Sequence, residues 1–347
     1  IRVYLGTRVS PIATTTTEGY GSFTTQFTID TQIYGTTTIE AKGTLTTVSA
    51  YGSITVQSNI ISITPQSGTV GSVVTVRGNG FGSTESIRIH FGSTSSIVLT
   101  TSVANGSFTT QFTIDTQGYG TTTITTDGIN TPIKPTGTFT ILPRMIYTSP
   151  LSGTVGTEIS IRGNGFGRSE TVNVQFGTTT AIISTQVTDV GSWTISFTIN
   201  TQGYGTTTIT ASGAATNVSA TSSVKIIQRI ISISTGTATV STVVTIQGDG
   251  YGVNEPIRIN FGTTQSITEW STDANGWFET TFTVDSQAYG NRTIKAAGRN
   301  TNIEDTKPFF IIGRVYYISP TTGTVGCVVT VKADGYGEGD LIQIAMK

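Results

Sequence analysis

The sequence predicts an all-β protein made of tandem antiparallel β-sandwich repeats, each about 85 residues long. Three observations support this fold class: the composition, an internal repeat and a two-residue periodicity within the repeat. Threonine is the most frequent of the 347 residues, and Ile, Val, Phe and Tyr supply much of the apolar content. These residue types favour a pleated, half-buried surface, and no long stretch rich in Leu, Ala, Glu and Lys indicates a helix.

The internal repeat is visible in one motif that returns at a constant spacing. The segment SGTVGSVVTVRGNGFG begins at Ser67 and returns as SGTVGTEISIRGNGFG at Ser152. It returns again as TATVSTVVTIQGDGYG at Thr237 and as TGTVGCVVTVKADGYG at Thr322, each step being 85 residues. The tyrosines of a second motif, YG, follow the same step at Tyr34, Tyr119, Tyr204 and Tyr289. A fixed period of this kind indicates a tandem-repeat architecture.

Apolar residues alternate with polar ones inside each repeat. Val74 and Val76 share one face of a predicted strand, while Thr75 and Arg77 share the other. The same alternation continues through SIRIHFG and GSFTTQFTID. About seven short strands bounded by turn residues are typical of an immunoglobulin-like (Ig-like) sandwich.

The period divides the chain into five units. A partial repeat at 1–57 precedes three full repeats at 58–142, 143–227 and 228–312, and a second partial repeat occupies 313–347. The last strand of one repeat runs almost directly into the first strand of the next, so we expect an extended, stiff rod. Each unit should span on the order of 35–45 Å.

One arginine recurs at each junction between units: Arg144, Arg229 and Arg314. These side chains could pair with a carboxylate of the neighbouring repeat or donate to backbone carbonyls at the joint. The alternative is that they are solvated charges between apolar strands.

The two partial units are complementary in sequence. Residues 1–57 correspond to the second part of a repeat and residues 313–347 to the first part, with one strand in common. In one interpretation, the end of one subunit completes the start of the next, and such a heterologous contact propagates into a filament. In the other, which we favour, the sequence is a stretch of a longer repeat protein, because it lacks an initiator Met and stops inside a predicted strand.

Charge and composition argue against several classes of function. Only 11% of residues are charged and the net charge is −1, so we expect no nucleic-acid partner. No apolar run predicts membrane insertion in this segment. Cys327 is alone and His90 is alone, which excludes an internal disulfide and leaves little basis for histidine catalysis. We therefore predict a protein that is not an enzyme and needs no cofactor.

Two sets of residues are candidates for ligand binding. Asp30, Asp115 and Asp285 recur after the FTID-type strand and are weak candidates for Ca²⁺, although an Asx-turn role is the simpler interpretation. Trp270 and Trp277 replace small polar residues of the other repeats, so they could contact a sugar or a neighbouring subunit.

Three N-glycosylation sequons occur in the sequence, at Asn105, Asn217 and Asn291. In a secreted protein they would be surface acceptors, so the sequence is compatible with a glycoprotein.

The repeated opening motif, IxIxPxSGTVGxxVTVxGxGFG followed by IxIxFG, resembles the IPT/TIG-type Ig-like domain. The third full repeat departs from it, with Ser234 and Thr235 where TP or SP stands elsewhere. The resemblance implies a structural protein of a prokaryotic cell surface, extracellular and self-associating, as part of a surface layer (S-layer) or filament. The alternative that it implies is an adhesin stalk or an array of carbohydrate-binding modules in a secreted protein.

Overall fold

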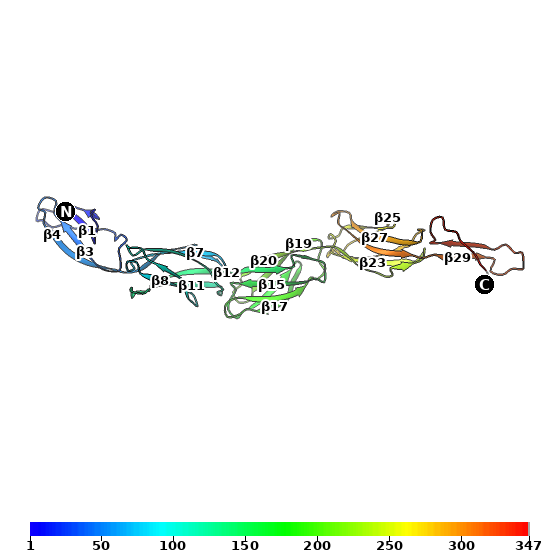
Figure 1. Cartoon of the computed structure of the whole chain (residues 1–347), viewed down its shortest axis with the longest axis horizontal. Coiled ribbons are helices and arrows are strands. Elements are labelled where there is room, and N and C mark those ends of the chain that lie inside the picture. Colours follow the sequence, from blue (N-terminus) through cyan, green and yellow to red (C-terminus); the bar gives the residue numbers. More distant parts are fainter. Residues whose placement is uncertain (346–347) are drawn as a thin grey trace.

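The computed structural model describes residues 1–345, and all the regular elements in that range are β-strands. Five units follow one another along a single axis, so the chain is an extended rod with its termini at opposite ends (Figure 1). The described residues contain no helix that could cross a membrane.

Each full repeat is a sandwich of a three-stranded and a five-stranded sheet. In the first full repeat (58–142) the smaller sheet has the order β10-β7-β5 and the larger one the order β6-β12-β11-β8-β9. The strands are β5 (Asn59–Thr64), β6 (Ser67–Thr69), β7 (Val73–Asn79), β8 (Ser86–Phe91), β9 (Thr94–Thr101), β10 (Phe108–Thr113), β11 (Gly120–Gly128) and β12 (Thr136–Leu142).

The second and third full repeats have the same topology. The second (143–227) contains β13 (Arg144–Ser149), β14 (Ser152–Gly153), β15 (Glu158–Asn164), β16 (Thr171–Phe176), β17 (Thr179–Gln186), β18 (Trp193–Thr198), β19 (Gly205–Gly213) and β20 (Ser219–Ile226). The third (228–312) contains β21 (Arg229–Ile233), β22 (Thr237–Ala238), β23 (Val243–Asp249), β24 (Pro256–Phe261), β25 (Thr264–Ser271), β26 (Phe278–Thr283), β27 (Gly290–Gly298) and β28 (Glu304–Ile311).

The predicted Ig-like sandwich is confirmed, with one difference in strand pairing. A short eighth strand at the SGT motif pairs with the last strand of its repeat in parallel, with Thr140 opposite Ser67 in the first full repeat. The same parallel pairing recurs between β14 and β20 and between β22 and β28. The sandwich is therefore mixed at one edge, although the other strand pairs are antiparallel.

Each full repeat has its own hydrophobic core, built from the alternating apolar residues. Val74 and Val76 are completely buried, as their alternation with Thr75 and Arg77 predicts. An edge-to-face aromatic pair packs in every full repeat: Phe81 with Phe108, Phe166 with Trp193, and Tyr251 with Phe278, with ring centroids 5.3, 5.6 and 5.3 Å apart. Such pairs add stability beyond the area that they bury.

The two terminal units are half sandwiches. The first partial unit is one sheet of order β2-β1-β3-β4, formed by β1 (Arg2–Leu5), β2 (Ala13–Thr14), β3 (Gly35–Lys42) and β4 (Ser49–Val56). The last partial unit contains β29 (Arg314–Ser319) and β30 (Thr330–Asp334). Apolar side chains that the full repeats bury are exposed here, among them Val329 at 43%, whose equivalents Val74, Ile159 and Val244 are completely buried.

Candidate functional site: the joints between repeats

The repeats are joined without a linker, and one backbone hydrogen bond crosses every joint. At the second joint, β12 ends at Leu142 and β13 begins at Arg144. The N–H of Tyr119 in the first full repeat donates to the carbonyl of Phe166 in the second, at 2.9 Å. The equivalent bonds at the other joints are Tyr34 to Phe81 (2.9 Å), Tyr204 to Tyr251 (2.8 Å) and Tyr289 to Tyr336 (3.1 Å). The YG motif of one repeat therefore contacts the end of the repeated opening motif, GFG or GYG, of the next repeat at each joint.

Glycine allows the two backbones to approach closely at this contact. Gly191, at a positive φ of 79°, faces Gly118 of the preceding repeat. A Cβ atom at Gly191 would lie 2.5 Å from the Cα of Gly118, closer than such atoms can approach. The corresponding Gly276 of the third full repeat faces Gly203 in the same way, at 3.0 Å. The joint is thus a packed backbone contact, which limits rotation of one repeat against the next.

The junction arginines lie at the joints, but their partners differ. Arg144 donates from Nη1 to the carbonyl of Val70 in the preceding repeat, at 3.1 Å. Arg229 pairs with Asp249 of its own repeat, at 3.2 Å. The carboxylate partner therefore comes from the arginine's own repeat and not from its neighbour.

The fourth joint combines both kinds of contact. Arg314 pairs with Asp334 of its own unit at 3.1 Å and donates to the hydroxyl of Ser241 in the preceding repeat at 2.8 Å. An arginine held in place by its own repeat can thus present its remaining N–H groups to the repeat before it.

Asp249 at the third joint is 2% exposed. Burial raises the pKa of its carboxyl group, because desolvation disfavours the charged form, and the adjacent Arg229 opposes that shift. The carboxylate of this ion pair is therefore poorly hydrated, whereas the side chain of Arg229 is 38% exposed.

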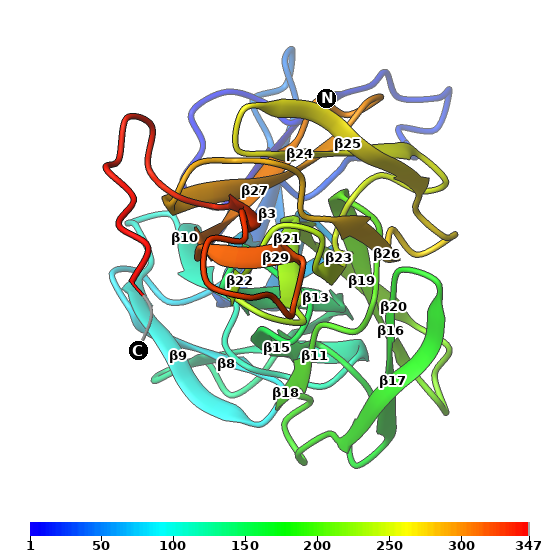
Figure 2. The same ribbon diagram turned by 90° about the vertical axis from the view of Figure 1, so that its right-hand side faces the viewer.

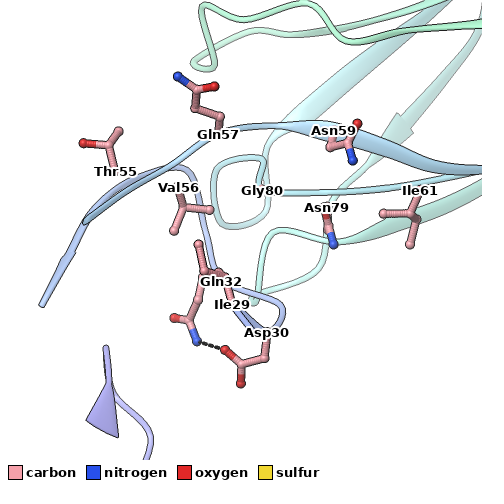
Figure 3. Close-up of a pocket in the computed structure, with 10 residues that line it drawn as sticks. All are labelled: Ile29, Asp30, Gln32, Thr55, Val56, Gln57, Asn59, Ile61, Asn79 and Gly80. Atoms are coloured by element: carbon pink, nitrogen blue, oxygen red, sulfur yellow. Dashed lines mark hydrogen bonds between the residues drawn. The ribbon is translucent and has the colours of Figure 1, made fainter. Parts of the chain in front are cut away.

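The first joint has a different structure, shown in Figure 3. Asn59 stands at the position of the junction arginines. A cavity of about 400 Å³ lies between the two units, with Asp30, Gln32 and Val56 on one side and Asn79 on the other (Figure 3). Inside it, Gln32 donates to Asp30 at 2.8 Å. Asn59 itself lines this cavity.

A buried glutamate in each full repeat stabilises the loop that contacts the preceding repeat. The sequence pattern did not identify this glutamate as a structural residue. Glu170 is 7% exposed and accepts hydrogen bonds from the N–H groups of Gly167 (2.5 Å), Ala215 (3.1 Å) and Thr216 (3.0 Å). The Thr216 hydroxyl also donates to it, at 3.0 Å. Glu85 and Glu255 make the equivalent contacts. Their common 85-residue spacing was the available signal.

The calcium candidates are engaged by neighbouring polar side chains. Asp115 accepts hydrogen bonds from Thr94 and from Gln117, and Asp285 accepts them from Thr264 and Gln287. Asp30 pairs with Arg8. Among residues 1–345, no three His, Cys, Asp or Glu side chains lie close enough together to hold a metal ion. The arrangement fits loop stabilisation, and it does not assemble a calcium ligand set.

The remaining candidates lie on the surface. Asn105, Asn217 and Asn291 are all exposed, so glycosylation at these sequons stays a prediction. Trp270 is 55% exposed, whereas Trp277 is half-buried. Cys327 is an exposed free thiol in the last partial unit.

Repeated Ig-like sandwiches connected by packed joints define a class of protein, the tandem Ig-like repeat protein. Within this class, the family model described as the IPT/TIG domain matches residues 58–141 and 143–226. These two repeats are therefore IPT/TIG domains in tandem, as the opening motif predicts.

Several solved structures are similar to the chain. A tetra-tandem repeat from the extending region of a large adhesion protein has 16% identity and a TM-score of 0.26, covering 90% of this chain and 91% of its own. Invasin, a bacterial integrin-binding protein, has 13% identity and a TM-score of 0.23, with coverage of 91% and 72%. The glucan-utilisation protein SGBP-B of Bacteroides ovatus has 13% identity and a TM-score of 0.23, with coverage of 76% and 72%. No curated protein matches the chain.

Proposed function

We propose that this chain is a structural segment of an extracellular, cell-surface protein, built into a surface layer or filament, and that its task is to hold a fixed, extended length. The observation that supports this is the recurrence of one backbone contact at all four joints. A linker-free joint closed by a backbone hydrogen bond and glycine packing resists bending, since neither surface can move without losing contacts. A rod of this kind transmits force or sets distance.

The rod form is the first point to test. Small-angle X-ray scattering of the chain should give the profile of a stiff, elongated particle. Removing the third full repeat together with the last partial unit should shorten the maximum dimension by roughly 35–45 Å for the full repeat, and by less than that again for the partial unit, because the strands of each unit fold back on one another. A compact particle, or a broad distribution of bent shapes, would contradict the proposal.

An adhesin stalk or an array of carbohydrate-binding modules is the second candidate function. The observation that favours it is the exposure of Trp270 on an otherwise threonine-rich surface. The two candidates differ in their behaviour in solution. A layer or filament subunit polymerises through its own surfaces, whereas a stalk binds its target as a monomer. Sedimentation with and without ligand distinguishes them.

A further inference from the structure

The third full repeat differs from the other two in the chemistry of its surface. It holds twice as many charged residues as the second full repeat and two of the three tryptophans of the chain. Repeats that serve only as spacers have no need of such a change. Four of its charged residues, Arg258, Glu269, Lys295 and Glu304, share the outer face of its five-stranded sheet. Strands β25 and β27 of this sheet lie at one side of the rod axis (Figure 2).

Four residues form a straight row across that face. Glu269 on β25 lies opposite Arg258 on β24, Arg258 lies opposite Ala297 on β27, and Ala297 lies opposite Glu304 on β28. Because Ala297 is small, a hollow of about 280 Å³ lies beside it, lined by Arg258, Ala297 and Glu304 of this row. Its lining also includes Arg299 and Asn302.

One of the charged side chains around the hollow has no partner of opposite charge among the described residues. Glu269 pairs with Arg299 at 3.3 Å, and Glu304 pairs with Lys295. Arg258 remains: within the described residues its guanidinium forms no ion pair, and its Nε is buried without a hydrogen-bond partner. The Nε atom is covered by the chain itself, so an acceptor from outside reaches the terminal N–H groups of Arg258, which also have no partner among the described residues.

We propose that this hollow binds an acidic glycan, with a uronate carboxylate on Arg258. A planar guanidinium donates two parallel hydrogen bonds to a carboxylate, which is the strongest pairing open to it. The hydroxyl groups of a sugar ring both donate and accept, and the hollow offers both the Glu304 carboxylate and the Asn302 amide.

Trp270 extends the proposed site along the free edge of the sheet. It follows Glu269 on β25, and these two residues line a second, shallow depression with Pro256 and Ser271. Because successive side chains of a strand alternate, Trp270 lies on the other side of β25 from Glu269. Only a glycan long enough to pass round the edge reaches it, and its apolar face can then stack on a later ring.

The test is calorimetric titration of the whole chain with galacturonate oligomers of three and six rings, and with neutral cello-oligosaccharides of the same lengths. We expect the acidic series to bind at least about tenfold more tightly, because the bond to Arg258 is charge-assisted. Arg258→Ala should remove that preference. Trp270→Ala should weaken the six-ring ligand and leave the three-ring ligand unchanged.

The first full repeat supplies a matched control. Arg88 occupies the position of Arg258, but its cross-strand neighbours are Leu99 and Asp127, so no small residue opens a hollow beside it. Arg88→Ala should therefore bind like the unsubstituted chain. The proposal is overturned if neither series binds, if both series bind equally, or if Arg258→Ala binds as tightly as Arg88→Ala.

Discussion

Replacing Glu170 by alanine is expected to lower the free energy of unfolding of the second full repeat by about 3 kcal/mol or more. The carboxylate is the common acceptor for three backbone N–H groups and the Thr216 hydroxyl. Alanine leaves these donors without a partner in a buried loop, and each unsatisfied donor costs its desolvation energy. The loop from Gly213 to Thr216 should lose its order first.

The measurement is urea unfolding followed by the fluorescence of Trp193, which lies in the core of this repeat at 3% exposure. Replacing Trp270 and Trp277 by phenylalanine makes Trp193 the sole reporter. Glu158→Ala is the matched control, because Glu158 is an exposed carboxylate of the same repeat. Equal losses in the two variants would show that the buried carboxylate has no special role.

The same carboxylate should make the second full repeat sensitive to acid. Burial alone would raise the pKa of Glu170, but hydrogen bonds from Thr216, Gly167 and Ala215 outweigh it and hold the pKa below its ordinary value of 4.5. A lowered folded-state pKa contributes stability that is present above pH 4.5 and is lost as the pH falls through the folded-state value. Glu170→Gln, which cannot ionise, should lack this part of the pH dependence.

Substituting Gly191 by alanine is expected to open the second joint while leaving both adjoining repeats folded. The new Cβ atom would lie 2.5 Å from the Cα of Gly118 and 2.9 Å from the carbonyl oxygen of Gln117, both in the preceding repeat. Both are backbone atoms that cannot rotate away, so the two repeats must separate. We expect the Tyr119 to Phe166 hydrogen bond to break and the angle between the repeats to vary.

Distances between spin labels report this change. Ser95 and Thr180 are exposed, equivalent positions of the first and second full repeats, and can carry the labels after Cys327→Ser. The control is Gly120→Ala, because Gly120 also has a positive φ, of 106°, but its Cβ would have no neighbour within 4 Å. A distance distribution that broadens equally in both variants would mean that backbone strain, and not the joint contact, is responsible.

Much of the fold is readable in the sequence because it depends on local periodicity. The alternation of Val74 with Thr75 predicts which face of the strand is buried, and both Val74 and Val76 are completely buried. The resemblance to IPT/TIG domains follows from the same motif and is confirmed for residues 58–141 and 143–226. A two-residue period shows which residues are buried even when the neighbouring strands are not known.

The joints were less accessible to sequence reasoning. The YG and GF motifs recur visibly, but nothing in their spacing shows that Tyr119 bonds to Phe166 of the next repeat. Glu170 was missed because an isolated glutamate in a sequence normally indicates a solvated surface. Its burial depends on N–H groups 45 and 46 residues away, which only the folded sandwich brings to it.

The hexapeptide FTTQFT, which occurs twice, shows most clearly what the sequence determines and what the tertiary structure decides. At Phe108–Thr113 it forms β10, paired along its length with β7. At Phe23–Thr28 the same six residues form no strand. The sequence by itself determines that Phe and Thr alternate and could line a sheet. Whether a strand exists depends on a partner, because an extended segment satisfies its N–H and C=O groups only through a neighbouring strand. Strand β7 supplies these partners to β10, whereas no strand of the described residues pairs with Phe23–Thr28.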